Sequence, residues 1–149
     1  MRVKALTMTL VVAAALLCSG CDPAASRRAG AVMADVNPFG WSSAAEVRFA
    51  NSDTLALTDL SLVLRRTSDS RACGLPLEIT LTAPDGSRLC DSVLFNLPRA
   101  ASTASTASVA TLPYRRGMRF GCEGVYTIVI RPLRTVRGVE AAGFTFDNN

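Results

Sequence analysis

The 149-residue sequence contains no histidine, and its last lysine is Lys4. Without histidine, the Ser-His-Asp and Cys-His forms of nucleophile activation are unavailable, and so are zinc sites that combine His with Cys. Beyond Lys4 the chain also has no amine for Schiff-base chemistry. A carboxylate pair is the remaining catalytic set, but the acids stand in turn-forming stretches such as "PDGS". We therefore expect a protein that is not an enzyme and that uses no cofactor or metal.

The N-terminus has the layout of a secretory signal peptide. Arg2 and Lys4 precede an uncharged, apolar run over residues 5–17, and the small residues "SG" follow two positions later. A basic start, a short apolar run and a small-residue cleavage site define such a signal. The run is shorter than the roughly 20 residues that a transmembrane helix needs. We therefore expect a signal peptide over residues 1–20.

The two cysteines of "LCSGC" decide how this signal ends. The stretch fits a bacterial lipobox loosely, with Cys21 as the lipid acceptor and Cys18 in the place where an aliphatic residue is usual. A redox or metal-binding pair is the competing interpretation, but no second ligand pair is near. We favour a lipidated Cys21 that anchors the protein in the outer membrane, facing the periplasm, because several acyl chains hold a protein there stably. Residues 21–40 then form a flexible tether.

The charge of the remaining chain does not favour a nucleic acid partner. The sequence has 16 basic and 12 acidic residues, and loss of Arg2 and Lys4 leaves 14 against 12, a net charge of about +2. The arginines are spread along the chain without a nucleic-acid-binding motif. Aromatic residues make up only 6% of the chain, which leaves few stacking platforms for a sugar ligand.

Apolar and polar residues alternate with a period of two through most of residues 41–149. The clearest run is Leu75, Leu77, Ile79 and Leu81, and "APDGS" after it supplies a hairpin turn. Repeated runs of this kind with turn-forming residues between them predict an all-β, antiparallel β-sandwich, either a jelly roll or immunoglobulin-like. Residues 100–112, rich in Ala, Ser and Thr, are expected to be a solvated loop.

Once Cys18 leaves with the signal peptide and Cys21 carries the lipid, three cysteine thiols remain, namely those of Cys73, Cys90 and Cys122. In an oxidising compartment this count predicts one disulfide and one free thiol. We prefer Cys73–Cys122, because each of the two precedes a strand, and Cys90–Cys122 is the next choice. In the predicted hairpin, Cys73 and Cys90 come close enough for a disulfide only if the strand breaks early, at Gly74 or Pro76.

Two triplets, "DTL" and "DSV", resemble the O-glycosylation signal of Bacteroidetes and point to Thr54 and Ser92. Short motifs of this kind recur by chance. Thr54 stands in a predicted turn and is the better acceptor, because a glycan needs surface and Ser92 stands in a predicted strand.

From Trp41 onward, the order of the strand patterns resembles the GldH family of gliding-motility lipoproteins from Bacteroidetes. The resemblance is carried by Cys21, by "DLSLVLRR" and "LPLEITLTAPDG", and most of all by "YRRGMRFGCEGVYTIVIRPLRTVRGVEAAGFTF". The chain departs from the family at residues 100–112, where a Gly-Trp-Gly-like stretch is usual, and at Leu133, where Met is usual. The matching positions are Trp41, Arg65, Pro84, Gly86, Asp91, Gly124, Tyr126, Arg134, Gly138, Val139 and Gly143.

The resemblance implies a non-enzymatic outer-membrane lipoprotein that is an accessory component of the gliding motility or type IX secretion machinery. Such a protein acts by contact with other envelope lipoproteins or secretion-machine proteins. Relatives also occur in bacteria that do not glide, so motility itself does not follow. The alternative is a glycan-binding or structural envelope lipoprotein.

Four of the matching positions are candidate partner contacts, namely Trp41, Arg65, Tyr126 and Arg134. For Trp41 we favour core packing, because tryptophan is largely buried in most proteins. Arg65 follows three inward-facing leucines, and a strand-end charge that reaches water is an equal alternative to a partner contact.

Overall fold

The computed structural model of this protein describes residues 30–68, 70–71, 73–98 and 107–148. The strands are β1 (Ala31–Asp35), β2 (Ala45–Asn51), β3 (Leu57–Arg66), β4 (Gly74–Thr82), β5 (Arg88–Asn96), β6 (Ser108–Arg119), β7 (Gly124–Pro132) and β8 (Val139–Asn148). The expected signal peptide, the lipidated Cys21 and the first part of the tether lie outside the described residues.

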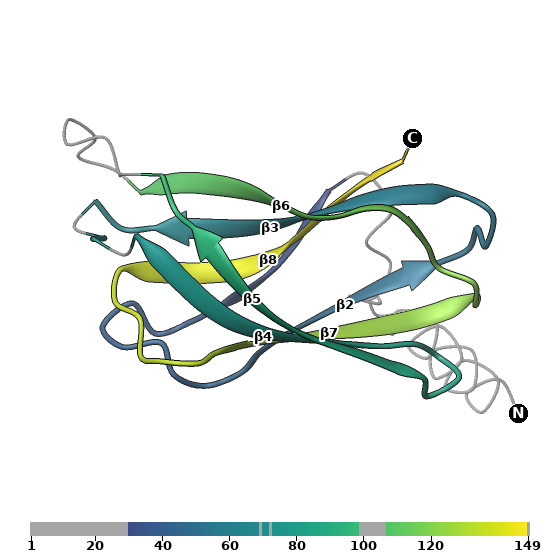
Figure 1. Ribbon diagram of the computed structural model, residues 1–149, viewed down its shortest axis with the longest axis horizontal. Helices are drawn as coiled ribbons and strands as arrows, with labels where there is room; N and C mark the ends of the chain where they lie inside the picture. The colour runs from purple at the N-terminus through teal and green to yellow at the C-terminus, as the bar shows by residue number, and fades with distance from the viewer. Residues whose placement is uncertain (1–29, 69, 72, 99–106, 149) are drawn as a thin grey trace, which may run out of the picture.

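The strands form two antiparallel four-stranded sheets, in the orders β1–β8–β3–β6 and β2–β7–β4–β5 (Figure 1). Along the chain the strand pairs are nested: β4–β5 lies within β3–β6, which lies within β2–β7, which lies within β1–β8. This is the connectivity of one long hairpin that has been rolled up. This arrangement of eight strands is a jelly roll. The predicted antiparallel β-sandwich is confirmed, and the immunoglobulin-like alternative is not the observed topology.

The period of two in the sequence is also the period of burial. In β4, Leu75, Leu77, Ile79 and Leu81 point inward and are at most 8% exposed, whereas the residues between them are half-buried. The turn after β4 places Gly86 at a φ of 84°, a conformation that glycine adopts without steric cost. The hairpin expected from "LEITLTAPDGSRLCDSVLF" is therefore present. It consists of β4 and β5, and β5 is an edge strand of the second sheet.

The sandwich begins earlier than the sequence analysis expected. Ala31–Asp35, placed there in the tether, form β1, which pairs with β8 in the register Met33 to Gly143. A Cβ on Gly143 would stand 1.9 Å from the carbonyl oxygen of Val32. The close approach of β1 to β8 thus depends on a glycine more than one hundred residues away. The sequence of residues 31–35 alone therefore does not predict a strand there.

The two ends of the sandwich carry different loops. Because neighbouring strands are antiparallel, residues 36–44, 67–68, 70–71, 73 and 133–138 come together at one end, which we call the pocket end. The chain enters β1 at Gly30, part-way along β8, because Ala31 pairs with Thr145, and β8 ends at Asn148 toward the opposite end. In Figure 1 the pocket end is on the left, where the yellow chain between β7 and β8 turns.

Candidate functional site: an arginine pocket

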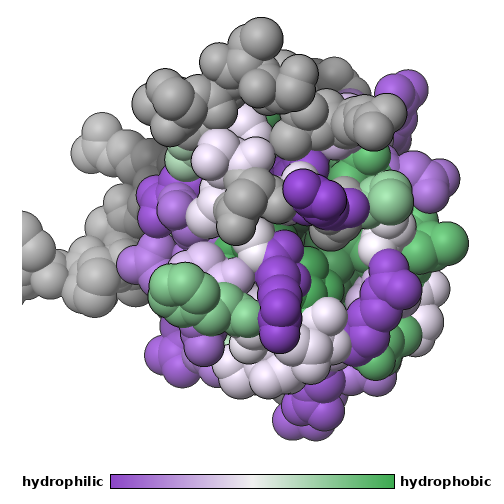
Figure 2. Space-filling view, turned by 90° about the vertical axis from the view of Figure 1, so that its left-hand side faces the viewer, coloured by the Kyte–Doolittle hydropathy of each residue, from purple (hydrophilic) through white to green (hydrophobic). Residues whose placement is uncertain are grey.

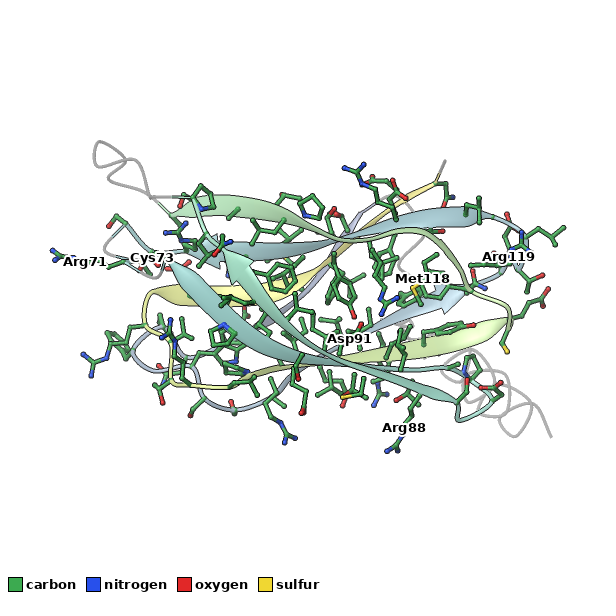
Figure 3. All side chains as sticks on the ribbon, in the orientation of Figure 1. Arg71, Cys73, Arg88, Asp91, Met118 and Arg119 are labelled. Carbon is green, nitrogen blue, oxygen red and sulfur yellow. The ribbon has the colours of Figure 1, made fainter. Side chains whose placement is uncertain are left out.

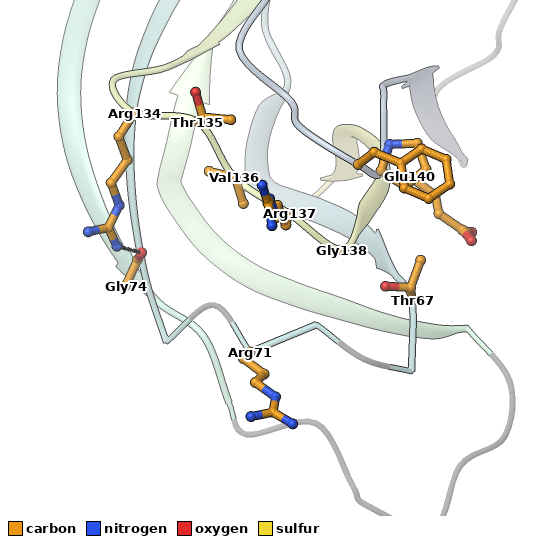
Figure 4. A pocket seen from close by; sticks show the side chains of 11 residues that line it. Thr67, Arg71, Gly74, Arg134, Thr135, Val136, Arg137, Gly138 and Glu140 are labelled. Atoms are coloured by element: carbon orange, nitrogen blue, oxygen red, sulfur yellow. Dashed lines mark hydrogen bonds between the residues drawn. The ribbon is translucent and has the colours of Figure 1, made fainter.

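A hollow of about 940 Å³ opens at the pocket end. Figure 2 looks onto this end and shows hydrophilic side chains with hydrophobic residues between them, and Figure 4 shows the lining from close by. The lining residues are Pro38, Phe39, Thr67, Arg71, Gly74, Arg134, Thr135, Val136, Arg137, Gly138 and Glu140. We call this hollow the arginine pocket, since three lining residues are arginines and one is acidic.

Backbone hydrogen bonds hold the pocket loops together. Trp41 and Val136 exchange two bonds, of 2.7 and 2.9 Å, so the loop after β1 is fastened to the loop before β8. The amide of Gly138 donates to the carbonyl of Pro38 at 2.8 Å, and its carbonyl accepts from the amide of Thr67 at 3.0 Å. Three segments that are distant in sequence are therefore joined at one glycine.

Only glycine fits at position 138. Its φ is 79°, in the left-handed region that side chains disfavour, and a Cβ there would lie 2.7 Å from the Cα of Ser70. Gly138 thus lets the β3–β4 loop, which carries Arg71, approach the loop that carries Arg137.

The pocket presents guanidinium groups. Nη2 of Arg134 donates to the carbonyl of Gly74 at 2.6 Å, a bond that orients this side chain across the rim (Figure 4). Arg71 and Arg137 are exposed and make no side-chain hydrogen bond or ion pair with the described residues. A guanidinium is always charged and offers a planar fork of donors to carboxylate or phosphate oxygens.

The acidic group of the pocket is already engaged. The Oε2 atom of Glu140 lies 3.2 Å from Nε of Arg65, and Nη2 of Arg65 lies 3.1 Å from Oδ1 of Asp35. Arg65 thus holds two carboxylates on the outer face of the first sheet, beside the pocket. Because Glu140 is paired outside the pocket, the lining as a whole has an excess of positive charge.

Phe39 projects from the rim of the pocket with 85% of its surface exposed. The preceding Asn37 accepts a hydrogen bond from the amide of Phe39 at 3.0 Å, which closes a tight turn in "NPFG". Phe39 is the most exposed of the large hydrophobic side chains among the described residues, and it stands beside the pocket arginines, so apolar and cationic surfaces adjoin there.

A second polar cluster links β5 and β6, the edge strands that face each other across the two sheets. Asp91 of β5 accepts from the hydroxyl of Tyr114 at 2.5 Å and from Nη2 of Arg115 at 2.6 Å, both in β6. The Tyr114 hydroxyl and the Arg115 guanidinium hold the pKa of Asp91 below its usual value. Burial and the bond to Asp91 raise the pKa of Tyr114 to about 12. A carboxylate held ionised in this way ties the sheets together and is a poor proton acceptor near neutral pH.

Arg66 is a buried charge that the sequence analysis did not identify. It is 2% exposed, and its Nη1 donates to the carbonyl of Pro98 at 2.8 Å, while Nε donates to the hydroxyl of Ser70 at 3.3 Å. These bonds fasten the base of the β3–β4 loop. The period of two could have found it, because inward-facing Leu60, Leu62 and Leu64 are continued by position 66.

The four candidate contact residues divide into two groups. Trp41 is 0% exposed and its indole donates to the carbonyl of Ser43 at 2.8 Å, and Tyr126 is 3% exposed. Both belong to the core, as favoured for Trp41, and neither offers a surface to a partner. Arg134 lines the arginine pocket, and Arg65 lies beside it through Glu140.

The preferred disulfide is wrong in this structure, which describes Cys73, Cys90 and Cys122 as free thiols. Cys73 and Cys122 do each precede a strand, but β4 and β7 are antiparallel, so their starts lie at opposite ends of the sandwich. The two thiols are separated by about the length of β4, roughly 30 Å for nine residues. Figure 3 places Cys73 at the pocket end, and Cys122 instead donates to Asp85 of the β4–β5 turn.

The exposure of the two candidate glycosylation residues is the reverse of the expected one. Ser92 is in β5 as expected, but it points to solvent from the outer face of an edge strand. Thr54 is in a bend as expected and is half-buried. A strand position hides a side chain only when it faces the core, so Ser92 is the more accessible hydroxyl.

Sequence reasoning missed Phe39, Arg71 and Arg137 as members of one site. Their segments are up to 98 positions apart, and only the jelly-roll topology brings them to one end. A local signal existed at Phe39, where "NPFG" is a turn sequence with a large apolar residue in it.

Among the described residues no group of side chains suits a metal ion, and no helix there is long and apolar enough to cross a membrane. No family model and no curated protein matches the sequence. Among solved structures, an arabinose-bound α-L-arabinofuranosidase is similar, with a TM-score of 0.39 and 13% identity. The similarity covers 85% of this chain and 20% of that chain, so this protein spans about a fifth of the enzyme's length.

Proposed function

We propose that this protein is a non-enzymatic, lipid-anchored protein of the outer membrane that acts by contact with other envelope proteins through its pocket end. The observation that carries the proposal is the arginine pocket, in which two exposed guanidinium groups and an exposed phenyl ring lie around one hollow. Arginine and aromatic side chains are enriched where proteins bind one another.

The machinery in which the protein acts is proposed from the family resemblance. The match to GldH patterns points to an accessory component of gliding motility or type IX secretion. The partners are then other envelope lipoproteins or secretion-machine proteins. The structure supplies a reason for several matching positions, since Gly138 joins the pocket loops and Gly143 admits β1.

Deletion of the gene tests this proposal. We expect secretion of type IX cargo proteins to fall and to return when the wild-type gene is restored. A variant with Cys21→Ser should lose membrane partitioning and fail to restore secretion. Normal cargo secretion in the deletion strain, with an intact envelope, would contradict the assignment to this machinery.

A glycan-binding envelope protein is the second candidate, and the exposed ring of Phe39 favours it. An aromatic face can stack against a sugar ring. Binding to a glycan array that is lost on Phe39→Ala would support this candidate, and co-purification with secretion-machine lipoproteins would support the first.

A further inference from the structure

We propose that the arginine pocket binds an acidic peptide segment of a partner protein, with carboxylates on Arg71 and Arg137 and an apolar side chain against Phe39. This inference rests on the proposed function, because it names the chemistry of the contact at the same surface. The inference goes beyond the proposed function because it names the class of ligand and the residues that bind the ligand.

The positive charge of the pocket favours an anionic ligand. The lining has three arginines and one glutamate, and Glu140 is paired with Arg65. Arg134 is held by Gly74 at the rim. In Figure 4 Arg137 lies between Arg134 on one side and Glu140 on the other, with Arg71 on the opposite wall. Arg71 and Arg137 are the groups whose donors are available to a ligand.

The polar groups of the pocket favour an anion over a neutral sugar. Sugar hydroxyls both donate and accept, so a sugar site needs acceptors as well as donors. The lining has one carboxylate, that of Glu140, which Arg65 already binds, and two hydroxyls, those of Thr67 and Thr135, so the three guanidinium groups make donors outnumber acceptors. A ligand made of acceptors, such as a row of carboxylates, matches a donor-rich wall, and two guanidinium forks can each bind one carboxylate bidentately.

The apolar part of the surface favours a peptide over a simple anion. Phe39 is 85% exposed, and Val136 belongs to the lining below it. An inorganic anion would leave this ring in water. A peptide that carries apolar residues beside its acids covers the ring while its carboxylates reach the arginines, which removes apolar surface from water.

The position of the pocket favours a protein over the anchoring membrane. The described chain starts at Gly30, part-way along β8, because Ala31 pairs with Thr145 and Asp35 with Ala141. From there the five residues of β1 run toward the pocket, and the loop after β1 carries Phe39 to the pocket rim. The pocket thus opens in the direction in which β1 runs, away from Gly30, through which the chain leads back to Cys21, so a protein partner is better placed there than the lipid headgroups.

Fluorescence anisotropy on the full chain in detergent micelles tests the inference. The probe is a labelled peptide that alternates glutamate with leucine, and its matched control has glutamine in place of glutamate. We expect the acidic peptide to bind, the neutral one to bind at least about tenfold more weakly, and added salt to weaken the interaction.

Two double variants separate the pocket from general charge. Arg71→Gln with Arg137→Gln should weaken binding of the acidic peptide by about tenfold or more. Arg88→Gln with Arg119→Gln removes the same charge from two exposed arginines away from the pocket (Figure 3) and should leave binding unchanged. Equal losses in both variants, or no binding of the acidic peptide, would overturn the inference.

Vesicles that contain phosphatidylglycerol test the membrane as ligand. Stronger binding of the wild-type chain than of the Arg71/Arg137 variant to these vesicles, without peptide binding, would also overturn the inference. If the Arg71/Arg137 variant still restores cargo secretion and retains its protein partners, the inference fails while the proposed function stands. If deletion has no effect on secretion but the peptide still binds, the proposed machinery fails while the ligand class stands.

Discussion

Replacing Gly143 by alanine is expected to detach β1 from the sandwich. A Cβ at this position would lie 1.9 Å from the carbonyl oxygen of Val32 and 2.6 Å from the Cα of Met33. A carbon and a carbonyl oxygen ordinarily approach to about 3.3 Å, so β1 must retreat by about 1.4 Å. Hydrogen bonds of about 2.9 Å would then be stretched well past the length at which they stabilise a sheet.

The expected cost follows from what β1 buries. Val32 and Ala34 pack partly buried against the core. Full burial of a valine contributes about 1.5–3 kcal/mol and a methyl group about 0.8 kcal/mol, so half-burial of both together is worth about 1.2–1.9 kcal/mol. For a domain of this size a loss of that magnitude lowers the midpoint of thermal unfolding by roughly 5–8 °C.

Hydrogen exchange and thermal unfolding measure the two effects. In Gly143→Ala, the amides of Ala31–Asp35 should lose protection while those of β4 keep it. Gly121→Ala is the matched control, because a Cβ at Gly121 meets nothing within 4 Å. Unchanged protection of β1, with a midpoint within about 1 °C of the wild type, would refute the argument from close approach.

Three further predictions concern other parts of the fold. Tyr114→Phe should lower the free energy of unfolding by roughly 1.5–3 kcal/mol at neutral pH, because it removes a hydrogen bond to the charged Asp91. Since the pKa of Asp91 is lowered and that of Tyr114 is raised from 10.0 to about 12, wild-type stability from this cluster should fade below pH 3.8 and again between pH 10 and 12 in denaturation series, and a flat profile would contradict it. Gly138→Ala should weaken binding of the acidic peptide and lower the unfolding midpoint, as measured by anisotropy and calorimetry. Mass mapping after alkylation should find Cys73 and Cys122 unlinked to each other, and a peptide that joins them would show the predicted register to be wrong.

The sandwich was predictable because its cause is local. Alternation of apolar and polar residues sets which side of each strand is buried, and the β4 residues Leu75 to Leu81 show this in sequence and structure alike. The turn at Gly86 was predictable for the same reason. The choice between a jelly roll and an immunoglobulin-like order was not, because strand pairing depends on partners far along the chain.

For the arginine pocket too, the local features were predictable from the sequence and the long-range arrangement was not. The sequence places Arg71, Arg134 and Arg137 near strand ends, and the resemblance singled out Arg134. Which strand ends share one end of the sandwich depends on the direction of each strand in the rolled hairpin. The same rule separated Cys73 from Cys122, two residues with equal local settings at opposite ends.

By itself, the sequence determined the chemical inventory and the class of fold. It has no histidine, it carries a signal-like N-terminus, and its residues alternate with the period of a strand. The tertiary structure decided that Trp41 and Tyr126 are core, that Ala31–Asp35 belong to the sandwich, and that Phe39 meets Arg71 and Arg137. The physical reason is that inventory and period are properties of neighbouring residues, whereas burial at strand ends and the composition of a pocket depend on long-range pairing between segments that only the folded chain brings together.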